Sequence, residues 1–252
     1  MGAPDLGTEP KIILFDIETA PRLAWVWGQY EQNVIDVKTE WYMLSFAWKE
    51  LGTQKVTVHA LPDYGAWQTT RENDSDLAVA LWKVLDDADV VIAHNGDRFD
   101  IRKANARFIA HGMKPPSPYK SVDTLKVARK HFKFDSNKLN DLGKYLGVGR
   151  KLPHTGAHLW FGCMNGDPKA WALMRRYNRN DVELLERVYL KLRPWATTHP
   201  SLTHYTSKTA CPTCQSPKII NSGYLYLKTG KRQRIKCTDC GAWSTRGGLI
   251  HV

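Results

Sequence analysis

Apolar and polar positions alternate in ways that predict strands and helices in turn along most of the chain. Short apolar runs rich in β-branched and aromatic residues predict strands at residues 11–17, 41–48, 55–60, 89–93 and 119–122. Helical periodicity predicts helices over residues 74–87 and 100–111, and over segments that begin near Asp123 and Leu139. The first three strands should form a meander, and the later strands should alternate with helices. We therefore expect an α/β fold.

The longest helical pattern covers residues 171–192. It is preceded by Asp167 and Pro168, which suit an N-cap and the first helical position, and a proline follows soon after its end. Residues four apart are neighbours on a helix, so Tyr177 and Asp181 should share one face. This stretch predicts one long helix with a polar pair on its side.

Four carboxylates stand out against this pattern. Asp16 and Glu18 lie in FDIET, Asp100 lies in HNGDRFD and Asp181 lies in YNRND. Residues two apart on a strand point to the same face, so Asp16 and Glu18 should project together. Hard cations such as Mg²⁺ bind carboxylate oxygens, and two cations about 3.5–4 Å apart can activate a water and stabilise a leaving oxygen. The pattern predicts a site for two divalent cations.

Each of these motifs alone has a simpler explanation. Acidic residues are common at strand ends, Asp100 suits a helix N-cap, and Tyr177 with Asp181 suits a solvated helix face. Three such motifs in one chain, each on a fitting element, favour the metal site over coincidence.

The same motifs resemble those of the DEDD superfamily of 3′–5′ exonucleases, which includes DnaQ-like proofreading subunits and the exonuclease domains of family B DNA polymerases. The matching elements are the D-x-E pair, N-x-x-x-F-D at residues 95–100 and Y-x-x-x-D at residues 177–181. Tyr177, preceded by Arg176 where the other branch has histidine, places the resemblance in the tyrosine branch. It covers about residues 11–192, and the opening segment is also similar to exonuclease-type proteins of tailed bacteriophages.

The resemblance implies a ribonuclease H-like mixed sheet flanked by helices, and it implies roles for the site residues. Asp16 would contact both metals, which would be Mg²⁺ or Mn²⁺. Glu18 and Asp181 would complete the site of the nucleophilic water, and Asp100 would hold the second metal. Tyr177 would orient the attacking water by a hydrogen bond from its hydroxyl. A neutral phenol is a poor general base at pH 7, so the metal would have to deprotonate the water.

Other residues near the motifs are expected to have supporting roles. Asn95 should contact the substrate or support a ligand, and Thr19 lies where the family's backbone approaches the terminal nucleotide. His94 is expected to be structural and Asp123 to cap a helix. The tryptophan-rich stretch at residues 25–48 suits either a substrate groove or core packing.

The charge of the chain agrees with a polyanionic partner. Its formal net charge is +11 although the predicted site concentrates acidic residues. The expected partner is nucleic acid with a single-stranded 3′ end, together with a polymerase or replication protein acting in trans. The sequence has no run of eighteen apolar residues that could span a membrane, and its first ten residues lack the features of a signal peptide. We expect a cytoplasmic protein with no membrane partner.

Four cysteines near the C-terminus form a second motif. Cys211 and Cys214 form one C-x₂-C pair, and Cys237 and Cys240 form another after a 22-residue interval. Two such pairs predict a structural zinc ribbon with four thiolate ligands. A pair of disulfides is the alternative, which a reducing compartment disfavours. Cys163 is expected to be an ordinary free thiol.

The segment around these cysteines is strongly basic. Residues 199–252 hold eight Lys or Arg against Asp239 alone, a net charge of +7. Residues 224–236 predict a hairpin turning at Thr229-Gly230, and alternation favours a loop with an odd number of residues. One face would then carry an aromatic and basic set suited to nucleic acid, namely Tyr224, Tyr226, Lys228, Arg232, Arg234 and Lys236. The alternative is a solvated ribbon that only packs on the main domain.

These features predict two domains and a nuclease. Residues 1–198 would form the ribonuclease H-like exonuclease domain, and residues 199–252 a linker and a zinc ribbon that binds nucleic acid. The predicted activity is a two-metal 3′–5′ exonuclease acting on single-stranded DNA. Two alternatives stay open, namely a structure-specific endonuclease or ribonuclease on the same fold, and a non-catalytic adaptor that works through its ribbon.

Overall fold

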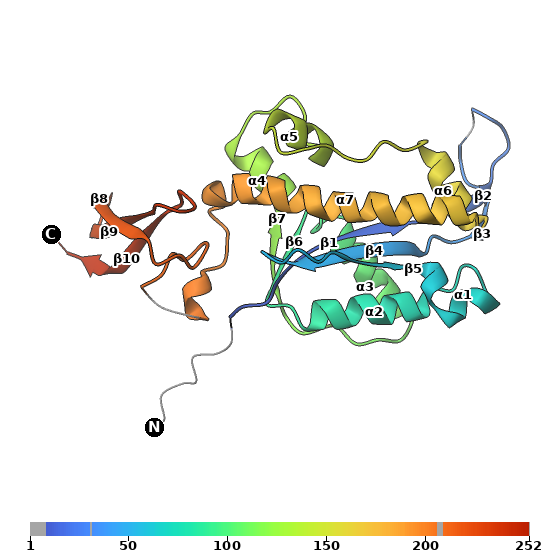
Figure 1. Ribbon diagram of the computed structural model, residues 1–252, viewed down its shortest axis with the longest axis horizontal. Coiled ribbons are helices and arrows are strands. Elements are labelled where there is room, and N and C mark those ends of the chain that lie inside the picture. Colours follow the sequence, from blue (N-terminus) through green and yellow to red (C-terminus); the bar gives the residue numbers. More distant parts are fainter. Residues whose placement is uncertain (1–8, 31, 206–208, 252) are drawn as a thin grey trace, which may run out of the picture.

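A mixed five-stranded sheet forms the centre of the protein, in a computed structural model that describes residues 9–30, 32–205 and 209–251 (Figure 1). Its strand order is β5-β4-β1-β6-β7. The strands are β1 (Ile12–Thr19), β4 (Met43–Glu50), β5 (Thr57–Ala60), β6 (Val90–Ala93) and β7 (Lys120–Asp123). The first three of these strands in the chain pair antiparallel, whereas β6 runs parallel to β1 and β7 runs parallel to β6. The predicted meander and the mixed sheet are confirmed.

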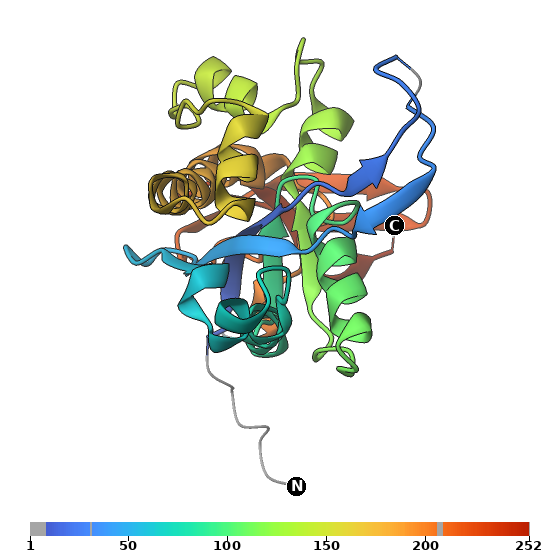
Figure 2. The same ribbon diagram turned by 90° about the vertical axis from the view of Figure 1, so that its right-hand side faces the viewer.

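Helices cover both faces of this sheet. On one face lie α2 (Ser75–Asp86) and α3 (Asp100–Ala110), and on the other lie α4 (Thr124–His131), α5 (Leu139–Tyr145) and the long α7 (Pro168–Leu192) (Figures 1 and 2). The side chains of β1 alternate between two hydrophobic clusters. Phe15 packs with the α2 and α3 side, and Leu14 packs with α7. Both residues are fully buried, so β1 lies in the middle of the core.

Two predicted helix caps are present. Asp167 accepts a hydrogen bond from the backbone N–H of Lys169 (2.9 Å) and Pro168 follows it as the first residue of α7. Asp123 accepts from the backbone N–H of Leu125 (2.9 Å) at the start of α4. Both aspartates satisfy amide groups that have no partner within the helix. The cap role expected for Asp123 is confirmed.

Several short elements carry too few residues to show a period in the sequence. Strands β2 (Leu23–Trp25) and β3 (Asp36–Thr39) form a separate antiparallel pair. The short helices are α1 (Gly65–Thr69), α6 (Ala157–Met164), and the 3₁₀ turns η1 (Leu61–Asp63), η2 (Arg193–Trp195) and η3 (Leu202–His204). Sequence periodicity predicted none of these elements. Helix α6 and the β2–β3 pair are the two that matter below.

A three-stranded antiparallel sheet of order β10-β9-β8 follows near the C-terminus. Its strands are β8 (Ile219–Leu227), β9 (Gly230–Cys237) and β10 (Trp243–Ile250). Leu227 pairs with Gly230, so the turn contains only Lys228 and Thr229. The predicted odd loop is therefore wrong. Gly230 has a φ of 146°, and its Cα lies against the backbone of Ile250, where a larger side chain would clash. Glycine tolerates the positive φ with which β9 begins directly after the two-residue turn.

The segment after α7 packs against that helix before the last three strands begin. The hydroxyl of Tyr189 lies 2.7 Å from Nε2 of His199. Leu202 is buried in the same hydrophobic cluster as Val188, and its backbone N–H donates to the carbonyl of Pro212 (2.8 Å). The boundary at residues 198 and 199 stays a prediction. Within the described ranges, no helix has both the length and the hydrophobicity needed to cross a bilayer.

Candidate active site

Three of the four predicted carboxylates converge where α7 crosses β1. Asp16 and Glu18 project from the same side of β1, and Asp181 lies on the face of α7 that packs on the sheet. One oxygen from each of the three carboxylates can be chosen so that all lie within 4.8 Å of one another. Asp181 is completely buried. The long helix thus brings a residue 163 positions after Glu18 into the same cluster.

Asp100 lies beside this cluster without joining it. It is the first residue of α3 and is only 3% exposed. Its Oδ1 accepts a hydrogen bond from the backbone N–H of Ile17 (3.1 Å), the residue between Asp16 and Glu18 on β1. Its charge is close enough to help raise the pKa of Asp16. The structure therefore groups three predicted ligands and places the fourth next to them.

Burial raises the pKa of all four predicted carboxylates, and repulsion between neighbours adds to the shift at Asp16 and Glu18. Burial, then the charge of Glu18, raises the pKa of Asp16 well above its usual value. Burial and the charge of Asp181 raise the pKa of Glu18 to about 8. Burial also raises the pKa of Asp100 to about 7 and that of Asp181. A protein that holds four buried or partly buried acids together stabilises their charged forms poorly unless cations are added.

Lys151 supplies the nearest positive charge and was not predicted from the sequence. Its Nζ donates to Oδ2 of Asp181 (2.6 Å) and to the hydroxyl of Tyr177 (3.1 Å). Burial opposes its charge, but the carboxylates of Asp181 and Asp16 raise the pKa of Lys151 above its usual value. It lies in the segment between α5 and α6, where the sequence has no periodic pattern. A lysine in such a segment cannot be recognised as a site residue from the sequence.

Tyr177 faces the cluster from α7, one turn before Asp181. Its ring packs edge-on against Trp160 and His154, with centroid distances of 5.8 and 4.9 Å. Burial, and then the charge of Asp181, raises the pKa of its hydroxyl. The phenol therefore stays neutral and keeps its proton at the edge of the site.

Two further side chains orient the carboxylates. Nε1 of Trp160, on the unpredicted helix α6, donates to Oε2 of Glu18 (3.1 Å). Nδ2 of Asn178 donates to Oδ2 of Asp16 (2.8 Å), and its Oδ1 accepts from the hydroxyl of Ser45 (3.1 Å). Asn178 directly follows Tyr177 in YNRND, so its position was available in the sequence. The sequence did not indicate that the side chain of Asn178 points towards Asp16.

The two nucleic-acid contacts predicted near the carboxylates lie at strand ends. Thr19 ends β1, and Asn95 follows β6 with a φ of 65°, in the left-handed region that asparagine tolerates. The backbone N–H of Asn95 donates to Oδ1 of Asp123 (2.9 Å). Asn95 lines a hollow of about 670 Å³ whose basic lining residues are Arg129, Lys138 and Lys151. Lys151 therefore faces both the hollow and the carboxylates.

His94 has the structural contacts expected of it. Its Nδ1 lies 2.9 Å from the hydroxyl of Thr124, and its Nε2 lies 3.0 Å from the carbonyl of Asn137. Burial lowers the pKa of His94 to about 4. The neutral ring bridges β6 to the loop before α5.

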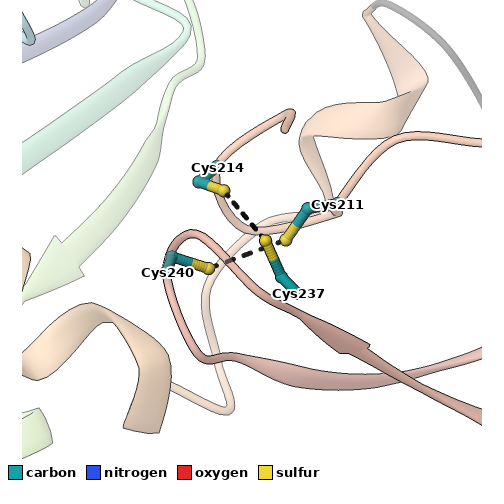
Figure 3. Close-up of side chains that lie close together, drawn as sticks. All are labelled: Cys211, Cys214, Cys237 and Cys240. Atoms are coloured by element: carbon teal, nitrogen blue, oxygen red, sulfur yellow. Dashed lines mark hydrogen bonds between the residues drawn. The ribbon is translucent and has the colours of Figure 1, made fainter. Parts of the chain in front are cut away.

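The four C-terminal cysteines converge from two tight turns (Figure 3). The Sγ atoms of Cys211 and Cys240 lie 3.8 Å apart, and those of Cys214 and Cys237 lie 3.7 Å apart. A tetrahedral zinc with Zn–S bonds of about 2.3 Å requires sulfur separations of about 3.8 Å. All five cysteines of the chain are free thiols, and Cys163 is buried in the main core. The sulfurs are therefore spaced for a metal and not bonded as disulfides.

The predicted binding face of the ribbon is divided between two faces. Tyr226 pairs with Lys231 and Tyr224 pairs with Gln233, so the tyrosines lie opposite the side that carries Arg232, Arg234 and Lys236. The two-residue turn containing Lys228 causes this division. The guanidinium of Arg234 lies 5.5 Å, and Nζ of Lys236 5.6 Å, from the ring centre of Trp243 on β10. Trp243 was missed because β10 was not predicted.

Stability without divalent cations should depend on pH. Groups whose pKa is raised by folding favour the folded state below their unfolded pKa and lose that contribution as pH rises through the folded pKa. With the pKa of Glu18 near 8 and that of Asp100 near 7, the free energy of unfolding should fall between about pH 5 and pH 8. Chemical denaturation in cation-free buffer measures this. Glu18→Gln should flatten the dependence, and a wild-type stability that rises over this range would contradict the account.

Comparison with known proteins places the chain in a family. Residues 40–193 match the RNase_H superfamily. A search of curated proteins found no match. The solved structure of the family B DNA polymerase from the hyperthermophilic archaeon Pyrobaculum calidifontis is similar, with a TM-score of 0.55 and 14% sequence identity over 88% of this chain.

The similarity spans only 32% of that polymerase, and at this identity it shows the fold alone. The family match covers more than half of the chain, and the mixed sheet flanked by helices has the ribonuclease H-like arrangement expected from the sequence. Membership of this family supports nuclease activity in general. The chain belongs to the RNase_H superfamily.

Proposed function

We propose that the protein is a divalent-metal-dependent 3′–5′ exonuclease that hydrolyses phosphodiester bonds at the 3′ end of nucleic acid, with single-stranded DNA as its preferred substrate. The observation that carries this proposal is the convergence of Asp16, Glu18 and Asp181 beside Tyr177. The order of the motifs along the chain supports the 3′–5′ direction through the resemblance to the tyrosine branch.

The residues of this cluster fit divalent cations. Among the residues that the structure describes, nothing donates a hydrogen bond to the buried Oδ1 of Asp181. Such an orphaned oxygen is costly unless a ligand occupies it. Asp16, Glu18 and Asp181 supply the carboxylate oxygens that Mg²⁺ or Mn²⁺ prefers, and Asp100 lies beside them for a second ion. Two bound ions would activate a water and stabilise the leaving oxygen.

The surrounding side chains have roles that follow from their contacts. Asn178 and Trp160 hold the carboxylates of Asp16 and Glu18 in fixed orientations. The neutral hydroxyl of Tyr177 is placed to hold a water by a hydrogen bond near Asp181. Lys151 donates to both Tyr177 and Asp181 and opens onto the basic hollow. Its ammonium is therefore placed to neutralise a phosphate that approaches from that side.

Substitutions at the cluster should separate ligand loss from water positioning. Asp16→Asn keeps the side-chain shape but removes a charge, so hydrolysis should fall by about 10²–10³-fold or more. Tyr177→Phe loses only the hydroxyl and should cost about 10–10³-fold. The assay resolves by size the products of end-labelled single-stranded and duplex DNA and RNA, with Mg²⁺ or Mn²⁺.

Glu183→Gln, on the same helix but outside the cluster, is the matched control and should retain wild-type activity. Stepwise shortening from the 3′ end is the expected product pattern. Cleavage of a circular single strand would instead support the endonuclease alternative. Asp16→Asn protein that retains more than a few per cent of activity would contradict the assignment.

We also propose that the four cysteines hold a structural zinc and that the ribbon binds nucleic acid. Four thiolates fill a tetrahedral zinc, so no position is left for a reacting water. Because the basic and tyrosine side chains lie on opposite faces, the proposed contact is the face of Arg234, Lys236 and Trp243. It joins cations to an exposed ring, as binding of a single strand requires.

The zinc and the ribbon can be tested with one cysteine variant. Elemental analysis should find about one zinc per chain, and Cys237→Ser should lose it because removal of one thiolate opens the site. The loosened ribbon should bind single-stranded DNA more weakly, with a shallower dependence of affinity on salt. Cys163→Ser, the buried thiol outside the cluster, should keep both properties. Zinc-free protein with unchanged affinity and salt slope would show that the ribbon is only a solvated surface.

A further inference from the structure

The hairpin formed by residues 20–30 and 32–40, which includes β2 and β3, exposes an unusual amount of apolar surface. Trp27 is 79% exposed and Tyr30 is 93% exposed. The other exposed apolar side chains of the hairpin are Leu23, Trp25, Val26, Val34 and Ile35. The hairpin projects from the body of the protein at the upper right of Figure 1 and of Figure 2. A concentration of exposed apolar side chains of this kind marks an interaction surface.

The hairpin continues directly from the strand that carries the carboxylates. The backbone N–H of Ala20 donates to the carbonyl of Tyr42 (2.9 Å), which closes the base of the hairpin. Trp25 follows Glu18 by seven residues, so the two lie at most about 25 Å apart. This reach corresponds to about seven nucleotides at a rise of about 3.4 Å each. A strand that ends at the carboxylates is long enough to touch the hairpin.

Rings and cations alternate between the carboxylates and the hairpin. Phe99 precedes Asp100, and Nζ of Lys103 lies 5.7 Å from the Phe99 ring and 3.5 Å from the Trp41 ring at the base of the hairpin. Arg107 also lies beside the Trp41 ring, but its guanidinium is ion-paired with the buried Asp74, so Lys103 is the cation available at this ring.

Beyond Trp41, Nζ of Lys38 lies 5.9 Å from the Trp25 ring on the paired strand. Stacking rings interleaved with cations are what single-stranded nucleic acid needs along its path.

The chemistry of the tip favours bases over a duplex backbone. Between Trp25 and Ile35 the sequence has one charged residue, Glu31. Binding to duplex phosphates requires a dense array of Lys and Arg, which this segment lacks. The tip therefore offers apolar and aromatic surface to unpaired bases, and the cations nearer the carboxylates serve the phosphates.

We propose that this hairpin binds the single strand on the 5′ side of the scissile phosphate by stacking on unpaired bases, and so guides the 3′ end to the carboxylates. The inference rests on the proposed exonuclease function and adds a length requirement: the strand must be several nucleotides long to reach the hairpin. A substrate too short to reach the hairpin gains nothing from it.

The test uses the full chain with Trp27 and Tyr30 both changed to alanine, because these two side chains are the most exposed and contribute least to the core. Affinity is measured in Ca²⁺ with a fluorescently labelled DNA single strand of about 20 nucleotides. A strand of this length covers a binding site of this kind. The dissociation constant should rise by about 10–100-fold, as expected for one or two lost stacked bases. Trp27→Phe with Tyr30→Phe keeps the rings and should bind like the wild type.

A nitrophenyl ester of a nucleoside monophosphate separates this inference from the proposed function. The ester occupies only the carboxylates, so the alanine variant should hydrolyse it in Mg²⁺ at the wild-type rate. Unchanged affinity for the long strand would overturn the inference and leave the hairpin as a surface for a protein partner. An equal loss of ester hydrolysis would also overturn it, because the damage would then lie at the carboxylates. If the wild type hydrolyses neither substrate, the exonuclease assignment fails, while weaker strand binding by the alanine variant still supports the hairpin's role.

Discussion

Repulsion among buried carboxylates is the constraint on which the rest of the structure depends. Asp16, Glu18 and Asp181 lie within one cluster and Asp100 lies beside it. Burial raises the pKa of each, and repulsion between the carboxylates adds to this shift at Asp16 and Glu18. Among the described side chains, Lys151 is the cation that bonds directly to one of them, Asp181. Such a concentration of acids lowers the stability of the folded state around the site. Packing of the hydrophobic core must therefore hold the carboxylates in place.

The fold provides that support from both sides of one strand. Strand β1 sends alternate side chains into two hydrophobic clusters, so its backbone is fixed while its C-terminal end presents the acids. Helix α7 packs across it and contributes Tyr177, Asn178 and Asp181 from the side that faces the sheet. The same strand continues into the exposed hairpin. The rigid strand β1 and the exposed surface of the hairpin are thus joined by a few residues of the chain.

Much of this arrangement could be predicted because its signals are long or local. The 25-residue α7 shows a sustained period and an Asp-Pro start, and the D-x-E spacing alone places two acids on one side of a strand. Lys151 and Trp160 could not be found, because one lies in an irregular segment and the other on an eight-residue helix. In the ribbon, the predicted shared face was wrong because β8 and β9 join through a two-residue turn. A single residue of shift exchanges the faces.

The central claim is that these carboxylates hold two divalent cations. Crystals of the protein soaked in Mn²⁺ test it most directly, through anomalous scattering at the cluster. The account predicts two peaks about 3.5–4 Å apart, one among Asp16, Glu18 and Asp181 and the other towards Asp100. No peak at saturating Mn²⁺, with Lys151 still bonded to Asp181, would contradict it.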